Sequence, residues 1–220
     1  MSAALVALAA GYLLGALPTA FLVARARGVN VFAVGSGSMG AMNTARNLGI
    51  GAGLLVLAVD VGKGALATLL GTALAGVEGV VSDPYALPAL LPPLAAGLGA
   101  VTGHCFSAYV RFRGGQGLAT ALGAALPLYP YPALYGVVLV VALVLLFRRS
   151  GPAILVTLGL YPVVTLLALD RHGWPREATF LVTTAVVLMC LVGLARQLVN
   201  RFGRARAQTG SAPAGDGHSA

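Results

Sequence analysis

The chain has 220 residues and a net charge of +8; 58% of its residues are hydrophobic and only 9% are charged. A soluble domain carries roughly 25% charged residues, so this composition excludes a soluble protein and indicates an integral membrane protein. The basic residues stand singly or in pairs without an aromatic stacking platform, which argues against nucleic acid as a partner.

The apolar runs, taken in chain order, predict a polytopic bundle of transmembrane helices. The first run, 3–24, has no basic residue before it and exceeds the ~7–15 residue core of a signal peptide, so we expect a retained helix. Six further runs follow at 51–75, 86–103, 118–129, 132–147, 152–169 and 178–195. The expected fold is therefore all-α, with about seven spans in one domain over 1–206 and a disordered polar tail over 207–220.

The run 118–129 leaves the number of spans open. It is short and ends in the segment Tyr129-Pro130-Tyr131-Pro132. It is either a tilted half-helix or, together with its successor, one re-entrant hairpin, which leaves six or five crossings as alternatives.

Charge placement predicts the orientation. With the N-terminus outside, nearly all arginines fall on the cytoplasmic side, and only Arg171 and Arg176 fall on the other. The C-terminus and both glycine-rich loops are then cytoplasmic. Cys105 and Cys190 have no disulfide or metal-binding spacing, so no metal or cofactor is expected.

The first glycine-rich loop has the features of a phosphate site. Successive N–H groups of Gly35-Ser36-Gly37-Ser38 can form a concave nest for an anion, and Arg46 adds a bidentate cation. The loop also matches GxGxxG through Gly40, but a dinucleotide fold requires a soluble βαβ unit that is absent here. A plain interfacial turn remains the alternative.

The second glycine-rich loop also has features of a phosphate site. Gly114-Gly115-Gln116-Gly117 opens the next span, so a helix N-terminus with partial positive charge follows a flexible turn. Arg111 and Arg113 precede it and serve either as phosphate ligands or as topological anchors. His104 is a candidate base, or a helix-end residue that bonds a backbone carbonyl.

Two charged residues lie within the second span. Asp60 and Lys63 share one helix face, where they can pair and reduce the cost of burying charge. They either contact the substrate or form a structural ion pair.

These segments resemble the bacterial acyl-phosphate:glycerol-3-phosphate acyltransferases over roughly 13–200. The first family motif matches Gly35-Ser36-Gly37, Gly40-Ala41, Asn43, Arg46 and Leu48-Gly49, and is followed by Asp60 and Lys63-Gly64. The second matches Gly103-His104, Phe106, the run 111–115, Gly117 and Ala119-Thr120. Two long motifs in the right order are more specific than either glycine cluster alone.

The resemblance implies transfer of a fatty acyl group from acyl phosphate to the sn-1 hydroxyl of glycerol 3-phosphate, giving lysophosphatidic acid. It implies a multi-pass protein of the bacterial inner membrane, with membrane lipids around it and the active site facing the cytoplasm. The expected catalytic residues are Ser36, Arg46, His104 and Asn200. The expected substrate-binding residues are Gly35, Gly37, Ser38, Gly40, Asn43, Lys63, Arg111, Arg113, Gly114, Gly115, Gln116 and Gly117.

Three polar positions depart from the family pattern. Ser38 replaces an Asn, Gln116 replaces a Lys, and Gln197 replaces a His three residues before Asn200. Loss of a Lys removes a charge-assisted contact worth about 1.5–3 kcal/mol. A catalytically altered paralogue that binds or transports lipid phosphates is therefore the alternative function.

Overall fold

The computed structural model describes residues 2–76, 83, 85–148 and 150–209, and within these ranges the chain is helical with no β-strand. The helices are α1 (Ala3–Gly15), α2 (Thr19–Arg25), α3 (Ala41–Leu48), α4 (Ile50–Ala75), α6 (Leu87–Cys105), the 3-10 helix η1 (Ala108–Val110), α7 (Leu118–Ala125), α8 (Pro130–Phe147), α9 (Ser150–Arg171) and α10 (Arg176–Thr209). The predicted all-α fold is confirmed. The expected polar tail lies largely outside the described residues.

Within the described ranges, five segments are long and apolar enough to cross a membrane. They are Ala3–Arg25, Ile50–Ala75, Pro130–Phe147, Gly151–Arg171 and Arg176–Asn200. Large apolar side chains point outward from them; Leu146 and Phe180, for example, are 73% and 75% exposed, which fits contact with lipid rather than water. The total of seven crossings and the orientation remain predictions.

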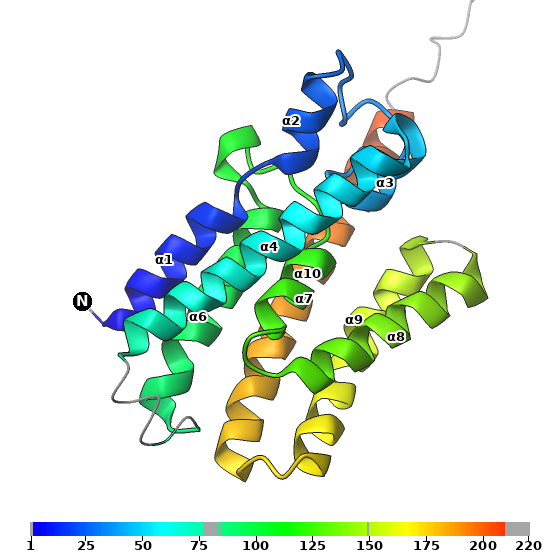
Figure 1. The fold of residues 1–220 in the computed structure, drawn as a ribbon. Helices are drawn as coiled ribbons and strands as arrows, with labels where there is room; N and C mark the ends of the chain where they lie inside the picture. The colour runs from blue at the N-terminus through cyan, green and yellow to red at the C-terminus, as the bar shows by residue number, and fades with distance from the viewer. Residues whose placement is uncertain (1, 77–82, 84, 149, 210–220) are drawn as a thin grey trace, which may run out of the picture.

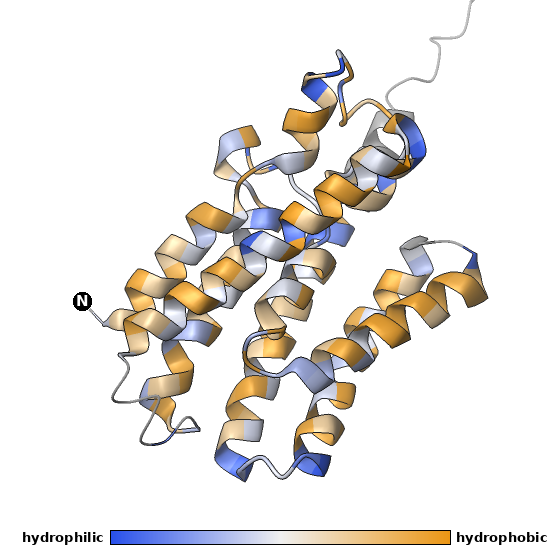
Figure 2. Cartoon of the chain, viewed as in Figure 1, coloured by the Kyte–Doolittle hydropathy of each residue, from blue (hydrophilic) through white to orange (hydrophobic). Residues whose placement is uncertain are grey.

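The connections gather at two ends of the bundle. The α2–α3 segment, the α8–α9 junction and the end of α10 lie at one end, and the start of α1 and the α9–α10 turn lie at the other (Figure 1). Figure 2 shows hydrophilic residues at both ends and in a cluster inside the bundle, beside the middle of α4. The α8–α9 hairpin is separated from α1 by α7 and α10.

The structure interrupts the first apolar run, which we expected to form one helix. Pro18 lacks an N–H and cannot continue the hydrogen-bond ladder, so α1 ends at Gly15 and α2 begins at Thr19. The break leaves two carbonyl oxygens without helical partners. Ser107 Oγ donates to the carbonyl of Ala16 at 2.5 Å, and Lys63 Nζ donates to that of Leu17 at 3.1 Å. The interruption thus ties α1 to residues that border the functional site.

Glycines allow α1 and α6 to approach closely. A Cβ on Gly11 would overlap the carbonyl oxygen of Ala96, and a Cβ on Gly99 would overlap that of Leu8. Small residues that let two backbones approach in this way are typical of helix–helix interfaces in membranes.

The short helix α7 packs against α4 inside the bundle. Its eight residues rise about 12 Å, less than half of a hydrocarbon core. A Cβ on Gly123 of α7 would overlap the carbonyl oxygen of Val61, and a Cβ on Gly64 of α4 would overlap that of Thr120. Backbone contact at these two glycines therefore fixes how α7 packs against α4.

Two glycines on α4 offer a matched test of this contact. Gly64→Ala is expected to lower the free energy of unfolding by about 1–3 kcal/mol, because the added methyl group meets backbone. Gly62→Ala meets nothing within 4 Å and is expected to be neutral or to stabilise by up to about 1 kcal/mol. Thermal unfolding of both purified variants checks this; equal midpoints would contradict the packing.

Candidate active site

A cavity of about 600 Å³ opens between the two glycine-rich loops and extends along α8, α9 and α10. Its polar end is lined by Ser36, Ser38, Arg46, Asp60, His104, Gln116, Gln197 and Asn200. Its apolar part is lined by side chains that include Leu122, Tyr129, Ala133, Val137, Ile154, Leu158 and Tyr161. One continuous space thus joins a cationic, hydrogen-bonding end to an apolar slot.

Asn43 organises the first glycine-rich loop from inside. It is buried, and its Nδ2 donates to the carbonyls of Ser38 and Val34 at 3.0 and 3.3 Å. Its Oδ1 accepts from the Ser36 N–H at 2.8 Å, and the Gly37 N–H donates to Val34 at 3.0 Å. Two N–H groups of the expected anion nest are therefore already bonded within the protein, so side chains must supply more of the contact with a ligand.

Exchange of the Asn43 amide for a carboxylate tests whether these hydrogen bonds hold the first glycine-rich loop in place. Asn43→Asp places an acceptor against two carbonyls and is expected to reduce activity at least tenfold and to destabilise the fold by about 1–3 kcal/mol. Asn30→Asp is the matched control, because Asn30 uses only its Oδ1, which accepts from the Phe32 N–H. Activity assays and thermal unfolding should show a loss for Asn43→Asp and little change for Asn30→Asp. Equal losses of activity and stability in the two variants would contradict the proposed function of Asn43 in the loop.

Positive φ angles explain two glycines of this loop. Gly35 and Gly37 have φ of 53° and 61°, in the left-handed region that favours glycine. A Cβ on Gly35 would also overlap the amides of Asn43 and Asn47. These glycines shape the loop, whereas Ser36 and Ser38 line the cavity.

Arg46 supplies the cation of the polar end. It lies on α3, lines the cavity and is exposed. Its nearest polar contact is the Met42 Sδ at 3.6 Å, and no described carboxylate pairs with it. The guanidinium is free to meet an anionic ligand in a bidentate manner.

The second glycine-rich loop brings the start of α7 to the same cavity. Gly117, with φ of 84°, precedes α7, and residues 116–119 line the cavity. The unpaired N–H groups of this first turn carry partial positive charge, which favours an anion. Gly114 and Gly115 pack against α6 instead: a Cβ on Gly114 would overlap the carbonyl of Cys105, and one on Gly115 the imidazole of His104.

A buried polar network lies beside the cavity. Asp60 Oδ1 is 2.8 Å from Lys63 Nζ and 3.6 Å from His104 Nδ1, and accepts from Thr19 Oγ1 at 3.3 Å. Asp60 and His104 line the cavity, whereas Lys63 does not. The expected pairing on α4 is present, and Lys63 binds Asp60 and the α1–α2 break rather than facing the cavity.

Helix α10 contributes three polar side chains. Gln197 and Asn200 line the cavity, and Gln197 Oε1 and Asn200 Nδ2 are buried without a protein partner. Arg196 donates to the carbonyls of Phe112 and Gly114 at 3.2 and 3.4 Å and thus holds the second loop against α10. In the sequence Arg196 directly follows the apolar run 178–195, so it was one of the arginines expected to orient the chain, and nothing local indicated its contact with the second loop.

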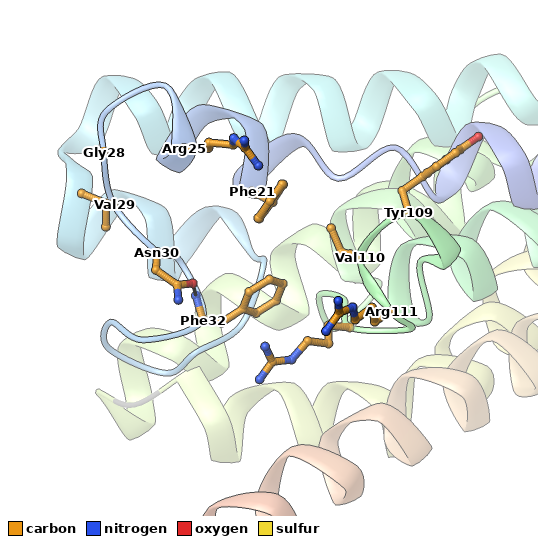
Figure 3. Close-up of a pocket in the computed structure, with 10 residues that line it drawn as sticks. Phe21, Arg25, Gly28, Val29, Asn30, Phe32, Tyr109, Val110 and Arg111 are labelled. Atoms are coloured by element: carbon orange, nitrogen blue, oxygen red, sulfur yellow. Dashed lines mark hydrogen bonds between the residues drawn. The ribbon is translucent and has the colours of Figure 1, made fainter.

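The structure brings together most of the residues predicted for the site. The predicted residues that line the cavity are Ser36, Ser38, Gly40, Asn43, Arg46, His104, Gln116, Gly117 and Asn200. The other predicted residues lie outside the lining, and among them Arg111 and Arg113 line a separate pocket (Figure 3).

The fold and cavity define an integral membrane protein whose internal site combines anion-binding groups with an apolar slot. Comparisons with known proteins agree with this class. A family model described as glycerol-3-phosphate acyltransferase matches residues 5–201. The glycerol-3-phosphate acyltransferase 1 of Deinococcus radiodurans is 40% identical over 84% of this chain and 86% of its own length. The glycerol-3-phosphate acyltransferase of Thermus thermophilus is 37% identical over 84% and 87%.

A solved structure shares the fold. The crystal structure of PlsY (YgiH), an integral membrane glycerol 3-phosphate acyltransferase in its glycerol 3-phosphate form, matches with a TM-score of 0.70 and 28% identity, covering 94% of this chain and 92% of that one. Its lysophosphatidic acid form matches with a TM-score of 0.69. This chain belongs to the glycerol-3-phosphate acyltransferase family, and the resemblance noted from its motifs is confirmed.

Proposed function

We propose that this membrane glycerol-3-phosphate acyltransferase takes its acyl group from acyl phosphate and transfers it to the sn-1 hydroxyl of glycerol 3-phosphate. The products are lysophosphatidic acid and phosphate. Family membership supports the acyltransferase activity and the phospholipid-forming function. The observation that carries the choice of substrates is the single cavity in which phosphate-binding groups continue into an apolar slot.

The polar end suits the phosphates of both substrates. Ser36 and Arg46 can hold the phosphate of glycerol 3-phosphate, and the start of α7 with Gln116 can hold that of acyl phosphate. Asn200 presents a buried Nδ2 that has no protein partner and can donate to a substrate oxygen. These groups place the hydroxyl beside the acyl carbon, so catalysis is mainly positioning and electrostatic stabilisation.

The transfer requires no covalent acyl-enzyme. The sn-1 hydroxyl oxygen attacks the carbonyl carbon, an ester C–O bond forms, and the bond from that carbon to the phosphate oxygen breaks. Phosphate leaves with the bonding electron pair. We assign His104 as acceptor of the hydroxyl proton, because it lines the cavity and Asp60 lies 3.6 Å from its Nδ1.

Arg46, in the polar end of the cavity, lies on α3, at the same end of the bundle as the end of α2 with Arg25 and the α8–α9 junction with Arg148 (Figure 1). We infer that this end faces the cytoplasm of a bacterial cell and that the protein lies in the inner membrane, with residues 1–206 as one acyltransferase domain. The alternative, a non-catalytic protein that binds or transports lipid phosphates, gains no support from the relatives, which are named as acyltransferases.

The apolar slot is expected to select the acyl chain. One side of α8 borders it over about 18 Å, through Tyr129 just before the helix and through Ala133, Gly136, Val137, Val140 and Val141. Ala133→Phe fills part of the slot and is expected to lower the rate with long-chain acyl phosphates at least tenfold, while shorter chains lose less. Val138→Phe, on the exposed side of α8, is the matched control. Rates measured across chain lengths check this; an equal loss at all lengths would contradict the assignment.

Activity of the purified protein tests the proposed donor. Acyl phosphate and glycerol 3-phosphate should give lysophosphatidic acid and phosphate in equal amounts, whereas acyl-CoA should give none. Product formed from acyl-CoA at a comparable rate would refute acyl phosphate as the specific donor.

A further inference from the structure

A second pocket, of about 550 Å³, lies on the other side of the second glycine-rich loop. Phe21 and Arg25 of α2 form one wall together with residues 28–30 and Phe32, and residues 109–111 face them from the other (Figure 3). It shares no lining residue with the catalytic cavity.

The pocket gathers positive charge without a protein counter-ion. Arg25, Arg111 and Arg113 line it, and no acidic residue does. Among the described residues none of the three forms a salt bridge, and Arg113 stacks on the Phe32 ring at 4.4 Å. Three guanidinium groups around one concave surface favour an anion, and their planar donors match phosphate oxygens.

A strained turn places Arg111 in this wall. Arg111 and Phe112 both have φ of 58°, a left-handed conformation that is unfavourable for two successive non-glycine residues. The Phe112 N–H donates to the Ser107 carbonyl at 2.8 Å, and Arg196 donates to the Phe112 carbonyl at 3.2 Å. Ser107, which precedes η1, and Arg196 of α10 thus hold the turn in this unfavourable conformation. In this conformation Arg111 faces the pocket from the wall opposite Arg25 (Figure 3).

The surroundings of the pocket identify the source of the anion. Tyr109, Phe112 and Leu22 are exposed by 56%, 62% and 55%. Tyr109 lines the pocket, and Phe112 and Leu22 are neighbours in sequence of the lining residues Arg111 and Phe21. Exposed aromatic and aliphatic side chains next to arginines mark the headgroup level of a bilayer, where the available phosphates are those of lipids.

We propose that this pocket binds the phosphate headgroup of an anionic membrane lipid, at a site separate from the catalytic cavity. Arg25 and Arg111 hold the phosphate from opposite walls, and Arg113, fixed by Phe32, completes the positive rim. Each arginine is expected to contribute about fivefold to lipid affinity, the factor for about 1 kcal/mol per cation at a membrane surface.

Native mass spectrometry of the purified full-length protein tests the site without depending on turnover. The protein is mixed with equal amounts of phosphatidylglycerol and phosphatidylcholine, and the fraction that retains each lipid is measured. We expect preferential retention of phosphatidylglycerol, a fall of about fivefold in its affinity for Arg25→Gln, and a larger fall for Arg25→Gln/Arg111→Gln. Arg25→Lys should keep most of the preference.

The matched control is Arg148→Gln, which removes an exposed arginine from the same end of the bundle but outside the pocket. It should retain phosphatidylglycerol like the unchanged protein. An equal fall for Arg148→Gln, no preference between the lipids, or displacement of phosphatidylglycerol by millimolar inorganic phosphate would each overturn the proposal. The last result would indicate a site for small soluble anions.

Discussion

Lys63→Met is expected to lower the free energy of unfolding by about 3–5 kcal/mol, because it leaves the buried Asp60 carboxylate without its lysine counter-ion. Both side chains are buried, and their charged atoms lie 2.8 Å apart. Lys63 also bonds the Leu17 carbonyl at the break between α1 and α2, which accepts from the Thr19 N–H as well. Its removal therefore affects α1, α4 and the histidine beside the cavity together.

A double-mutant cycle separates the ion pair from the rest of the network. Replacement of both charges, as in Asp60→Leu/Lys63→Met, leaves no unpaired ion and is expected to cost less than the sum of the single changes by about 1–3 kcal/mol. Unfolding in denaturant checks all three variants. Additive single effects, or a Lys63→Met effect below about 0.5 kcal/mol, would show that the pair does not stabilise the bundle.

Arg46→Ala is expected to lower kcat/KM by about 10- to 100-fold while leaving stability unchanged. Loss of one charge-assisted contact with phosphate costs about 1.5–3 kcal/mol of binding free energy. Stability should not change, because Arg46 is exposed and its nearest polar contact is the Met42 Sδ. Arg46→Lys keeps the charge without the bidentate geometry and should recover only part of the activity.

Arg148→Ala controls for a general loss of positive charge at this end of the bundle. Arg148 is exposed at the α8–α9 junction and does not line the cavity. Initial rates at varied glycerol 3-phosphate should show the loss for Arg46→Ala alone. An equal loss for Arg148→Ala would mean that Arg46 acts through the overall surface charge.

The residues of the polar end could be predicted because their signal is local. Ser36 and Arg46 lie within one short loop and helix, and His104 and Gly117 lie close together in the second motif, so each cluster was compatible with an anion site and the two motifs in order indicated one. The cavity brings both clusters together with Asn200. The all-α fold was equally predictable, because long apolar runs without charge have few stable alternatives in a membrane.

Features that depend on backbone direction or on distant segments could not be predicted. The spacing of Arg111 and Arg113 in the sequence does not show whether their side chains face the cavity or the second pocket. The left-handed backbone at 111 and 112 directs them to the second pocket. The bonds from Asn43 to the Ser38 carbonyl and the Ser36 N–H depend on how the loop folds, so its function within the loop could not be predicted from the sequence. The apolar slot has no motif, because α7, α8, α9 and α10 each supply a few ordinary aliphatic side chains.

The most direct test of the account is a set of initial-rate measurements in which acyl phosphate and glycerol 3-phosphate are varied together. A single cavity that holds both substrates predicts intersecting double-reciprocal lines, no acylated protein and no phosphate release before glycerol 3-phosphate is added. Parallel lines, with a burst of phosphate and a labelled acyl-enzyme in the absence of acceptor, would contradict direct transfer within one site.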